Sequence, residues 1–362
     1  MTTGETISRH VVGLAALSAI TAVIATICLG CSERPEGRVV NNCVGGCEQP
    51  APAEVFGPAD PGDWTAFRAD ARRTGMARDV EIGGEVEVVW RRENFLELEY
   101  TAVKPSPAVW GDGLYCASDT GVMWAFDRHT GEPLWSNHLS HSTKGIHGSP
   151  AVTRATVLIG TYSGNLHALD RQTGREIWRY NIGNSIGSSA IYVQEHNAVY
   201  VSHETVPEDG LPGGGYVTKN SPGSGQPIWR SKKLRHWPHA SVAVDPELGV
   251  VVVGANDGIF HAYDSDTGEE LWKRDFEPGE AEDPPSADIK TTAAISSERN
   301  LAIFGTWDDH VYALDLTTGE TAWSVDTGGR LMGSAAVDDR AGRAYVGTLV
   351  HDEALLAIDL DS

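Results

Sequence analysis

The sequence predicts an all-β fold, a β-propeller of six four-stranded blades, and three observations lead to it. The pattern Ala-x-Asp-x-x-Thr-Gly-x-x-x-Trp recurs four times and ends at Trp135, Trp178, Trp272 and Trp323. Tryptophans at 90, 135, 178, 229, 272 and 323 are spaced by 45, 43, 51, 43 and 51 residues, and propeller blades repeat about every 40 to 50 residues. Forty glycines and 18 prolines favour turns over helices.

Each period contains the same succession of elements. It opens with a strand of small residues, expected at 104–109, 147–152, 186–191, 239–244, 290–295 and 332–337. A second strand, a turn and a third strand follow, and the Thr-Gly turn then leads into a fourth strand that carries the tryptophan. Glycine adopts the positive φ of such a turn without strain. The indole ring is expected to pack between neighbouring blades while its N–H finds a partner.

The two ends of the repeat region complement each other. The last copy ends at residues 355–362 without the Thr-Gly pair or the tryptophan, whereas residues 86–92 form a tryptophan strand that no other strand precedes. Joined, the two segments would complete one blade and remove exposed strand edges. The predicted number of blades is therefore six.

Two features interrupt the regular pattern. The copy that ends at Trp229 has Ser221 and Ser224 in place of the aspartate and the threonine. Insertions at 203–215 and 277–288 account for the two longer intervals. They are expected to be loops, which is where binding residues often lie.

The N-terminus is typical of an exported protein. Residues 11–29 are apolar, follow Arg9 and lead into small Gly30 and Cys31. This arrangement resembles a lipobox, so Cys31 is predicted to carry lipid and Ser32 to favour the outer membrane of a Gram-negative cell. A plain secretory signal and an uncleaved membrane anchor are open alternatives, and all three export the chain.

The predicted domain organisation has three parts: a lipoprotein-type signal peptide at 1–30, a flexible tether rich in proline and glycine at 31–62, and the propeller at 63–362. Cys43 and Cys47 lie in the tether and could form a small disulfide loop in an oxidising compartment, so their pairing is open. The formal charge of −22 argues against nucleic acid as a partner, because phosphate binding needs a dense basic patch.

The repeat and the Gly-Ser-Pro-Ala-Val strands resemble the pyrroloquinoline quinone (PQQ)-like repeat family over about residues 64–362, with a lead-in at 63–77. One branch of that family, the quinoprotein dehydrogenases, holds PQQ and calcium. Another branch is non-enzymatic and includes the BamB-like lipoproteins that assist outer-membrane protein assembly. Both branches usually have eight blades, so six is a departure.

The enzyme branch implies an adjacent pair of cysteines, calcium ligands and an aspartate base. This chain has no adjacent cysteines, and the aspartates at 127, 170, 264 and 315 belong to the turn motif. His138, His141 and His236 are interpreted as separate solvated or hydrogen-bonded side chains, so no metal site is predicted.

One candidate site emerges where the first strands open, because first strands line a propeller's central channel. The opening residues are Lys104, His147, Ile186, His239, Lys290 and Met332. In a ring of six, Lys104 would face His239 and His147 would face Lys290, forming a basic collar able to bind an anion. Alternatively, these side chains meet carboxylates such as Asp288. Tyr162 and Trp307 would add a flat stacking surface if they reach the same mouth.

The sequence thus favours an exported, lipid-anchored and non-enzymatic propeller, expected to be a monomer, that binds protein partners at the cell envelope without a cofactor. A BamB-like role in outer-membrane protein assembly follows from the resemblance, with the two insertions as contact edges. The alternative is a quinoprotein-type oxidoreductase that binds PQQ with calcium, or another anion, through Lys104, His147, His239 and Lys290. No motif supports a hydrolase or lyase.

Overall fold

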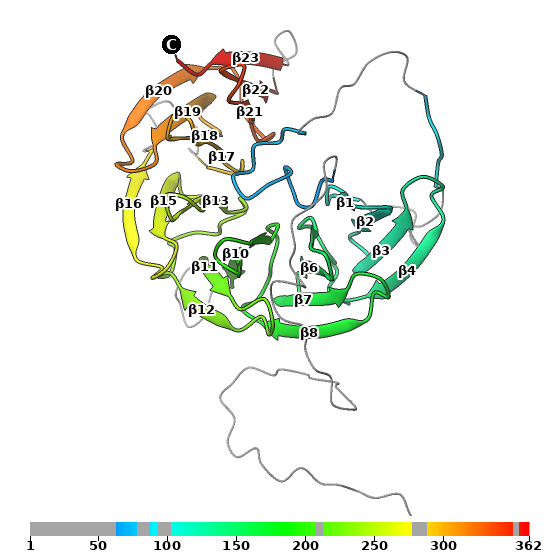
Figure 1. Cartoon of the computed structure of the whole chain (residues 1–362). Coiled ribbons are helices and arrows are strands. Elements are labelled where there is room, and N and C mark those ends of the chain that lie inside the picture. Colours follow the sequence, from blue (N-terminus) through cyan, green and yellow to red (C-terminus); the bar gives the residue numbers. More distant parts are fainter. Residues whose placement is uncertain are drawn as a thin grey trace, which may run out of the picture. The chain divides into compact units, whose positions relative to one another are not determined.

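The computed structural model describes residues 63–77, 87–92, 103–206, 213–276, 288–349 and 355–361, and every regular element in these ranges is a β-strand. The strands form six antiparallel sheets, five with four strands and one with three. Figure 1 shows these sheets as blades around the segment 63–77. The predicted six-bladed, all-β propeller is confirmed. No helix among the described residues has the length and apolar character needed to cross a bilayer.

Within each blade the strands follow one another in chain order from the centre to the rim. Blades 1 and 2 contain β1 (Ala108–Trp110), β2 (Gly113–Ala117), β3 (Val122–Asp127), β4 (Pro133–His138), then β5 (Ala151–Val152), β6 (Thr156–Gly160), β7 (Asn165–Asp170) and β8 (Glu176–Asn181). Blades 3 and 4 contain β9 (Ile191–Val193), β10 (Ala198–Thr205), β11 (Gly214–Asn220), β12 (Pro227–Arg230), then β13 (Ala243–Asp245), β14 (Val250–Gly254), β15 (Ile259–Asp264) and β16 (Glu270–Asp275). Blades 5 and 6 contain β17 (Ala294–Ser296), β18 (Leu301–Gly305), β19 (His310–Asp315), β20 (Thr321–Asp326), then β21 (Ala336–Asp338), β22 (Arg343–Gly347) and β23 (Leu355–Asp359).

The apolar core lies between neighbouring blades. The second strands β6, β14 and β18 are buried along their whole length. Phe260 of blade 4 and Phe304 of blade 5 stack with ring centroids 4.1 Å apart. Each blade is therefore stabilised mainly by the apolar area that it buries against the next blade.

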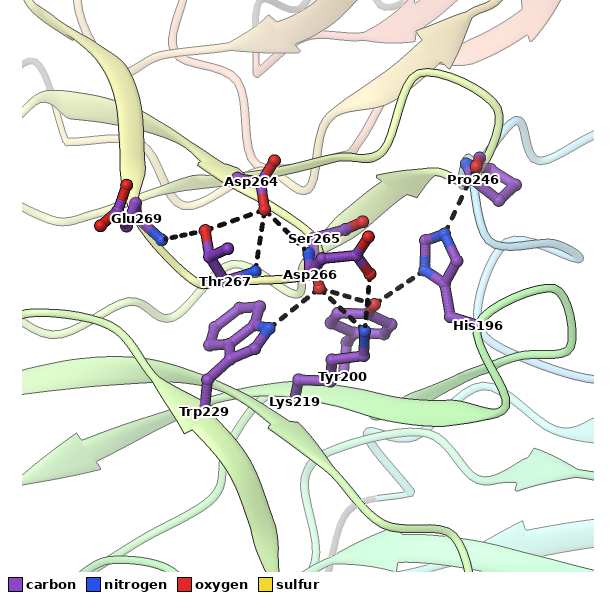
Figure 2. A network of polar contacts seen from close by, with 10 residues as sticks. All are labelled: His196, Tyr200, Lys219, Trp229, Pro246, Asp264, Ser265, Asp266, Thr267 and Glu269. Atoms are coloured by element: carbon purple, nitrogen blue, oxygen red, sulfur yellow. Dashed lines mark hydrogen bonds and ion pairs between the residues drawn. The ribbon is translucent and has the colours of Figure 1, made fainter.

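The recurring tryptophan contacts the Thr-Gly turn of the following blade, as predicted. Trp229 Nε1 donates a hydrogen bond to the Ser265 carbonyl, 2.9 Å away in blade 4 (Figure 2). The Asp264 carboxylate shapes this turn by accepting bonds from the Thr267 amide and hydroxyl at 2.8 and 2.9 Å. Gly268 completes it with a φ of 73°, and a Cβ there would overlap the Trp229 ring. The same contact recurs in the pairs Trp90–Gly131, Trp135–Gly174, Trp178–Gly225 and Trp272–Gly319.

A β-bulge in the fourth strand of blades 1 to 5 places the tryptophan of that strand. The register with the third strand shifts directly before the tryptophan, so that Leu134 of β4 has no partner opposite it in β3. Ile177, Ile228, Leu271 and Ala322 occupy the same place in the other four outer strands. The extra residue is pushed outward and the indole is turned inward, and the irregular edge resists pairing with another chain.

The sixth blade departs from the pattern. The predicted joining of residues 86–92 to the last repeat stays a prediction, because the described residues 87–92 form no strand beside β23. Trp90 nevertheless donates a 2.8 Å hydrogen bond to the Arg128 carbonyl, as an outer-strand tryptophan does. Trp323, which faces the shortened blade, has a buried Nε1 that finds no hydrogen-bond partner in the described part of the chain.

The lead-in segment forms a hub that closes one end of the inner strands. Its carbonyls accept hydrogen bonds from the amides of Val109, Val152, Val244, Ile295 and Val337 at 2.6 to 2.9 Å, one in each of five blades. Arg73 reaches the remaining blade by donating to the Ser189 carbonyl at 2.9 Å. It also donates to the carbonyls of Val242 and Phe67. These bonds connect all six blades to the hub.

A relay of hydroxyl groups links the blades beside the hub. The amide of each member donates to the hydroxyl of the next at 2.9 or 3.0 Å, in the order Ser106, Ser149, Ser189, Ser241, Thr292 and Ser334. These residues lie in the expected first strands, of which only the later part pairs as a strand. The relay therefore satisfies backbone amides that the sheets leave unpaired.

Candidate functional site at the channel mouth

The residues two positions before the hydroxyl relay form the opposite end of the inner strands, which we call the mouth. They are Lys104, His147, Gly187, His239, Lys290 and Met332. The expectation that Ile186 opens the third blade is wrong. Ser189, not Ser188, joins the relay, so Gly187 occupies the mouth and Ile186 is fully buried against Gly160.

Lys104 and His147 meet over one carboxylate. Lys104 Nζ lies 3.0 Å from His147 Nε2 and 3.0 Å from Asp119 Oδ2, and His147 Nε2 lies 3.3 Å from Asp119 Oδ1. The Tyr162 ring stands edge-on to His147 at 4.3 Å. Burial and the nearby Lys104 ammonium lower the pKa of His147, so its imidazole is neutral at neutral pH.

Glu204, which lies in β10 of blade 3, faces His239. The opening position of blade 3 itself is Gly187, which has no side chain. His239 Nε2 lies 3.7 Å from Glu204 Oε1, and Ser185 donates a 3.0 Å hydrogen bond to the other carboxylate oxygen. Burial lowers the pKa of His239, although the Glu204 charge opposes this shift. A Cβ at Gly187 would lie 2.8 Å from the Tyr162 hydroxyl and 3.2 Å from Glu204 Oε1, so glycine makes room for both.

Lys290 is held between a carboxylate and an aromatic ring. Its ammonium lies 3.0 Å from Asp288 Oδ2 and 3.1 Å from the centroid of the Trp307 ring. The Arg330 guanidinium lies 5.3 Å from the same centroid. Trp307 Nε1 donates to Met332 Sδ at 3.2 Å, which joins blades 5 and 6 at the mouth.

The predicted cations therefore gather at the mouth, but each of them has an acidic partner. Asp119 serves Lys104 and His147, Glu204 serves His239, and Asp288 serves Lys290. The alternative interpretation of the sequence, in which nearby carboxylates meet these side chains, describes the observed geometry. Tyr162 and Trp307 do reach the mouth, and burial raises the pKa of Tyr162 to about 12.

Sequence reasoning named Asp288 but missed the carboxylates Asp119 and Glu204 and two further cations. Asp119 holds in blade 1 the position that Tyr162 and Trp307 hold in their blades, directly after a buried Ser or Thr at the end of the second strand. Aligning that position across all blades in the sequence would have identified Asp119 as a residue of the mouth. Lys144, whose ammonium lies 5.1 Å from the Tyr162 ring, and Arg330 come from the loops that lead into blades 2 and 6.

The residues at the mouth do not fit PQQ with calcium. PQQ is a flat quinone with several carboxylates, which requires uncompensated cations and an open aromatic face. Here Lys104 and Lys290 are each paired with a carboxylate, the two histidines are held neutral, and the Lys290 ammonium covers a face of Trp307. Among the described residues, no group of three or more His, Cys, Asp or Glu side chains is placed to hold a metal ion.

The sequence pattern of the family described as outer membrane protein assembly factor BamB matches residues 70–206 and 213–362. The chain belongs to this family. BamB from Moraxella catarrhalis is 19% identical with a TM-score of 0.53, over 69% of this chain and 70% of that one. No curated protein matches the sequence.

Quinoprotein enzymes share the BamB-like fold. The quinohemoprotein alcohol dehydrogenase ADHIIG from Pseudomonas putida HK5 is 16% identical with a TM-score of 0.64, over 80% of this chain and 57% of its own. A europium-containing methanol dehydrogenase is 15% identical with a TM-score of 0.60, over 71% of this chain and 66% of its own. At these identities the similarity concerns the fold, so activity has to be argued from the site.

Proposed function

We propose that this BamB-family chain is a cell-envelope scaffold that binds partner proteins during outer-membrane protein assembly and catalyses no reaction itself. The observation that carries the proposal is the charge pairing at the mouth. Asp119 and Asp288 already compensate Lys104 and Lys290, the cations that an anionic cofactor would need. Family membership supports the same role, because the family is described by assembly rather than by catalysis.

The hub gives a scaffold the rigidity that partner binding favours. A surface that is already ordered loses less conformational entropy when it binds. Because the hub bonds to all six blades, mouth residues from different blades keep fixed relative positions. A partner can thus contact several blades at once without first ordering them.

The test of this function is the composition of the outer membrane in cells that lack the protein. We expect the amount of folded β-barrel proteins to fall and to recover when the wild-type chain is supplied. The Lys104→Met variant should restore assembly as well as wild type does, because a scaffold does not need a cofactor site. An unchanged outer membrane in cells lacking the chain would contradict the proposal.

The proposed location is the periplasmic side of the outer membrane, with lipid on Cys31 and the tether 32–62 between the anchor and the propeller; both segments lie outside the described residues. Changing Cys31→Ser should abolish lipid attachment and leave the signal peptide uncleaved, since a signal peptide of this type is processed at the lipidated cysteine. Mass spectrometry should then find an unlipidated precursor that is missing from the outer-membrane fraction. Cys43→Ser is the matched control and should leave a lipidated chain in the outer membrane. A Cys31→Ser chain with the same mature N-terminus and the same place in the outer membrane as wild type would contradict lipid anchoring.

A further inference from the structure

Blades 5 and 6 carry a contiguous surface at the mouth, which we call the Trp307 platform and define as Lys290, Trp307, Arg330, Met332 and Leu349. We infer that the platform binds a partner protein through a segment in which an apolar side chain is flanked by carboxylates. This inference rests on the proposed function and adds to it the place and the chemistry of the contact.

The platform is continuous because its members touch in series. Trp307 Nε1 bonds to Met332 Sδ, the Arg330 side chain lies over the Trp307 ring, and the Leu349 amide donates a 3.1 Å bond to the Arg330 carbonyl. Met332 is 53% exposed and Leu349 is 65% exposed. Two apolar side chains of blade 6 thus face solvent beside the half-buried indole of blade 5, which is the arrangement of an anchor position in an interface.

Charge determines what kind of segment fits. Lys290 is shared with Asp288, whereas Arg330 has no carboxylate partner in the part of the chain that the structure describes. The whole chain carries a formal charge of −22, and here the Arg330 guanidinium lies beside the exposed apolar side chains of Met332 and Leu349. A carboxylate of the partner would supply the missing counter-ion, and Arg forms such pairs with well-defined geometry.

Composition separates the platform from the exposed apolar residues of the outer strands. Leu134, Ile177, Ile228 and Leu271 are also exposed, but each is the single extra residue of a β-bulge on a different outer strand. Isolated apolar residues of this kind are normal on protein surfaces. The platform instead combines Trp, Arg and Met, the residue types that are enriched in protein interfaces.

The test is site-specific photocross-linking in the native envelope, with the full-length chain. A photoreactive residue replaces Leu349 in one variant and the exposed Leu271 of β16 in the control. We expect position 349 to cross-link to an envelope protein, and mass spectrometry to place the link in a segment with Asp or Glu on both sides of an apolar residue. Position 271 should give no such product.

A second change tests the charge. Arg330→Glu should lower the cross-linked yield from position 349 by about tenfold, the loss expected for an interface anchor. Arg274→Glu on β16 makes the same charge change on an exposed site away from the mouth and should leave the yield unchanged. Equal melting temperatures of the two variants would show that Arg330→Glu acts on binding. Equal yields from them would overturn the inference.

A third photoreactive position separates this inference from the proposed function. Val206 follows β10 at the blade 3 side of the mouth and is exposed. Cross-links to envelope proteins from 206 but not from 349 would overturn the platform and leave the scaffold function standing. Links from 349 to residues 277–287 of the same chain, to a second copy, or to a basic segment would also overturn the platform. No envelope product from either position would contradict both.

Discussion

The two ends of the inner strands are built in different ways. At the hub end, backbone amides of five blades bond to the carbonyls of residues 63–77 in one repeated geometry, and buried Arg73 reaches the remaining one, blade 3. At the mouth end, every blade presents a different surrounding, with Lys, His, Gly or Met at the equivalent position. The regular hub end joins the six blades, and the irregular mouth end carries the varied side chains that partner recognition needs. Stability and recognition should therefore respond to substitutions at opposite ends.

The largest expected effect is at the hub. Arg73 is fully buried, and burial lowers its pKa to about 9, so it is charged at neutral pH. Arg73→Met would leave the carbonyls of Phe67, Ser189 and Val242 without their donor. We expect the free energy of unfolding to fall by about 3–5 kcal/mol in denaturant titrations. Arg274→Met on the surface should change it by about 0.5 kcal/mol or less. An equal loss of unfolding free energy in the two variants would contradict the assignment of stability to the hub end.

The next effect concerns the glycine turns that the blades share. Gly174→Ala places a Cβ into the Trp135 ring at a φ of 69°, and we expect a loss of about 2–4 kcal/mol from strain and overlap together. Gly328 has nearly the same φ, 67°, but a Cβ there has no heavy atom within 4 Å. Gly328→Ala should therefore cost only the strain, about 1–2 kcal/mol. If thermal unfolding gave the same loss of stability for both variants, the contact between the Trp135 ring and the glycine turn would not be stabilising.

The pH dependence of the unfolding free energy tests the burial of a histidine next to the mouth. His203 precedes Glu204 in β10, and burial lowers its pKa to about 3. An unfolded histidine has a pKa of about 6.5, so between these values the unfolded state binds the extra proton. Stability should then fall as pH falls, by up to about 1.4 kcal/mol per pH unit, until the folded pKa is reached. His203→Phe should flatten the curve below pH 6.5. A slope unchanged by the substitution would contradict the burial argument.

The smallest effects compare the relay with the mouth. Ser241→Ala removes the acceptor of the buried Ser189 amide and should cost about 1–2 kcal/mol. Lys104→Met, two residues before the relay, breaks a half-exposed ion pair with Asp119 and should cost about 0–1 kcal/mol. Denaturant titrations of both variants under one condition measure the difference. A mouth substitution that cost more than the relay substitution would reverse the assignment of the two ends.

The parts of the fold that recur were predictable from the sequence. The pattern around Trp135, Trp178, Trp272 and Trp323 predicted the blades, the Thr-Gly turns and the indole between blades, because local turn chemistry repeats there. The bulges at Leu134 and its counterparts were not predictable, because residue spacing does not reveal a one-residue shift of register. The adjacent Ser188 and Ser189 led to the wrong opening residue in blade 3 for the same reason.

The mouth was predictable only in part. Counting positions along the first strands put Lys104, His147, His239 and Lys290 at equivalent places, and the structure brings Lys104 to His147, His239 to Glu204 and Lys290 to Asp288. Their partners Asp119 and Glu204 follow second strands, so the ion pairs depend on how two strands end side by side. The hub was recognisable as a lead-in segment, but its bonds to blades as far along the chain as Val337 are long-range backbone contacts that carry no residue signature.

The measurement that tests the central claim most directly is equilibrium binding of PQQ to the purified full-length chain by calorimetry, with and without calcium. The charge pairing at the mouth predicts no saturable binding up to high-micromolar PQQ. Saturable binding that is lost in the Lys104→Met and Lys290→Met double variant would contradict the account, because it would show that the mouth cations are available to an anionic cofactor.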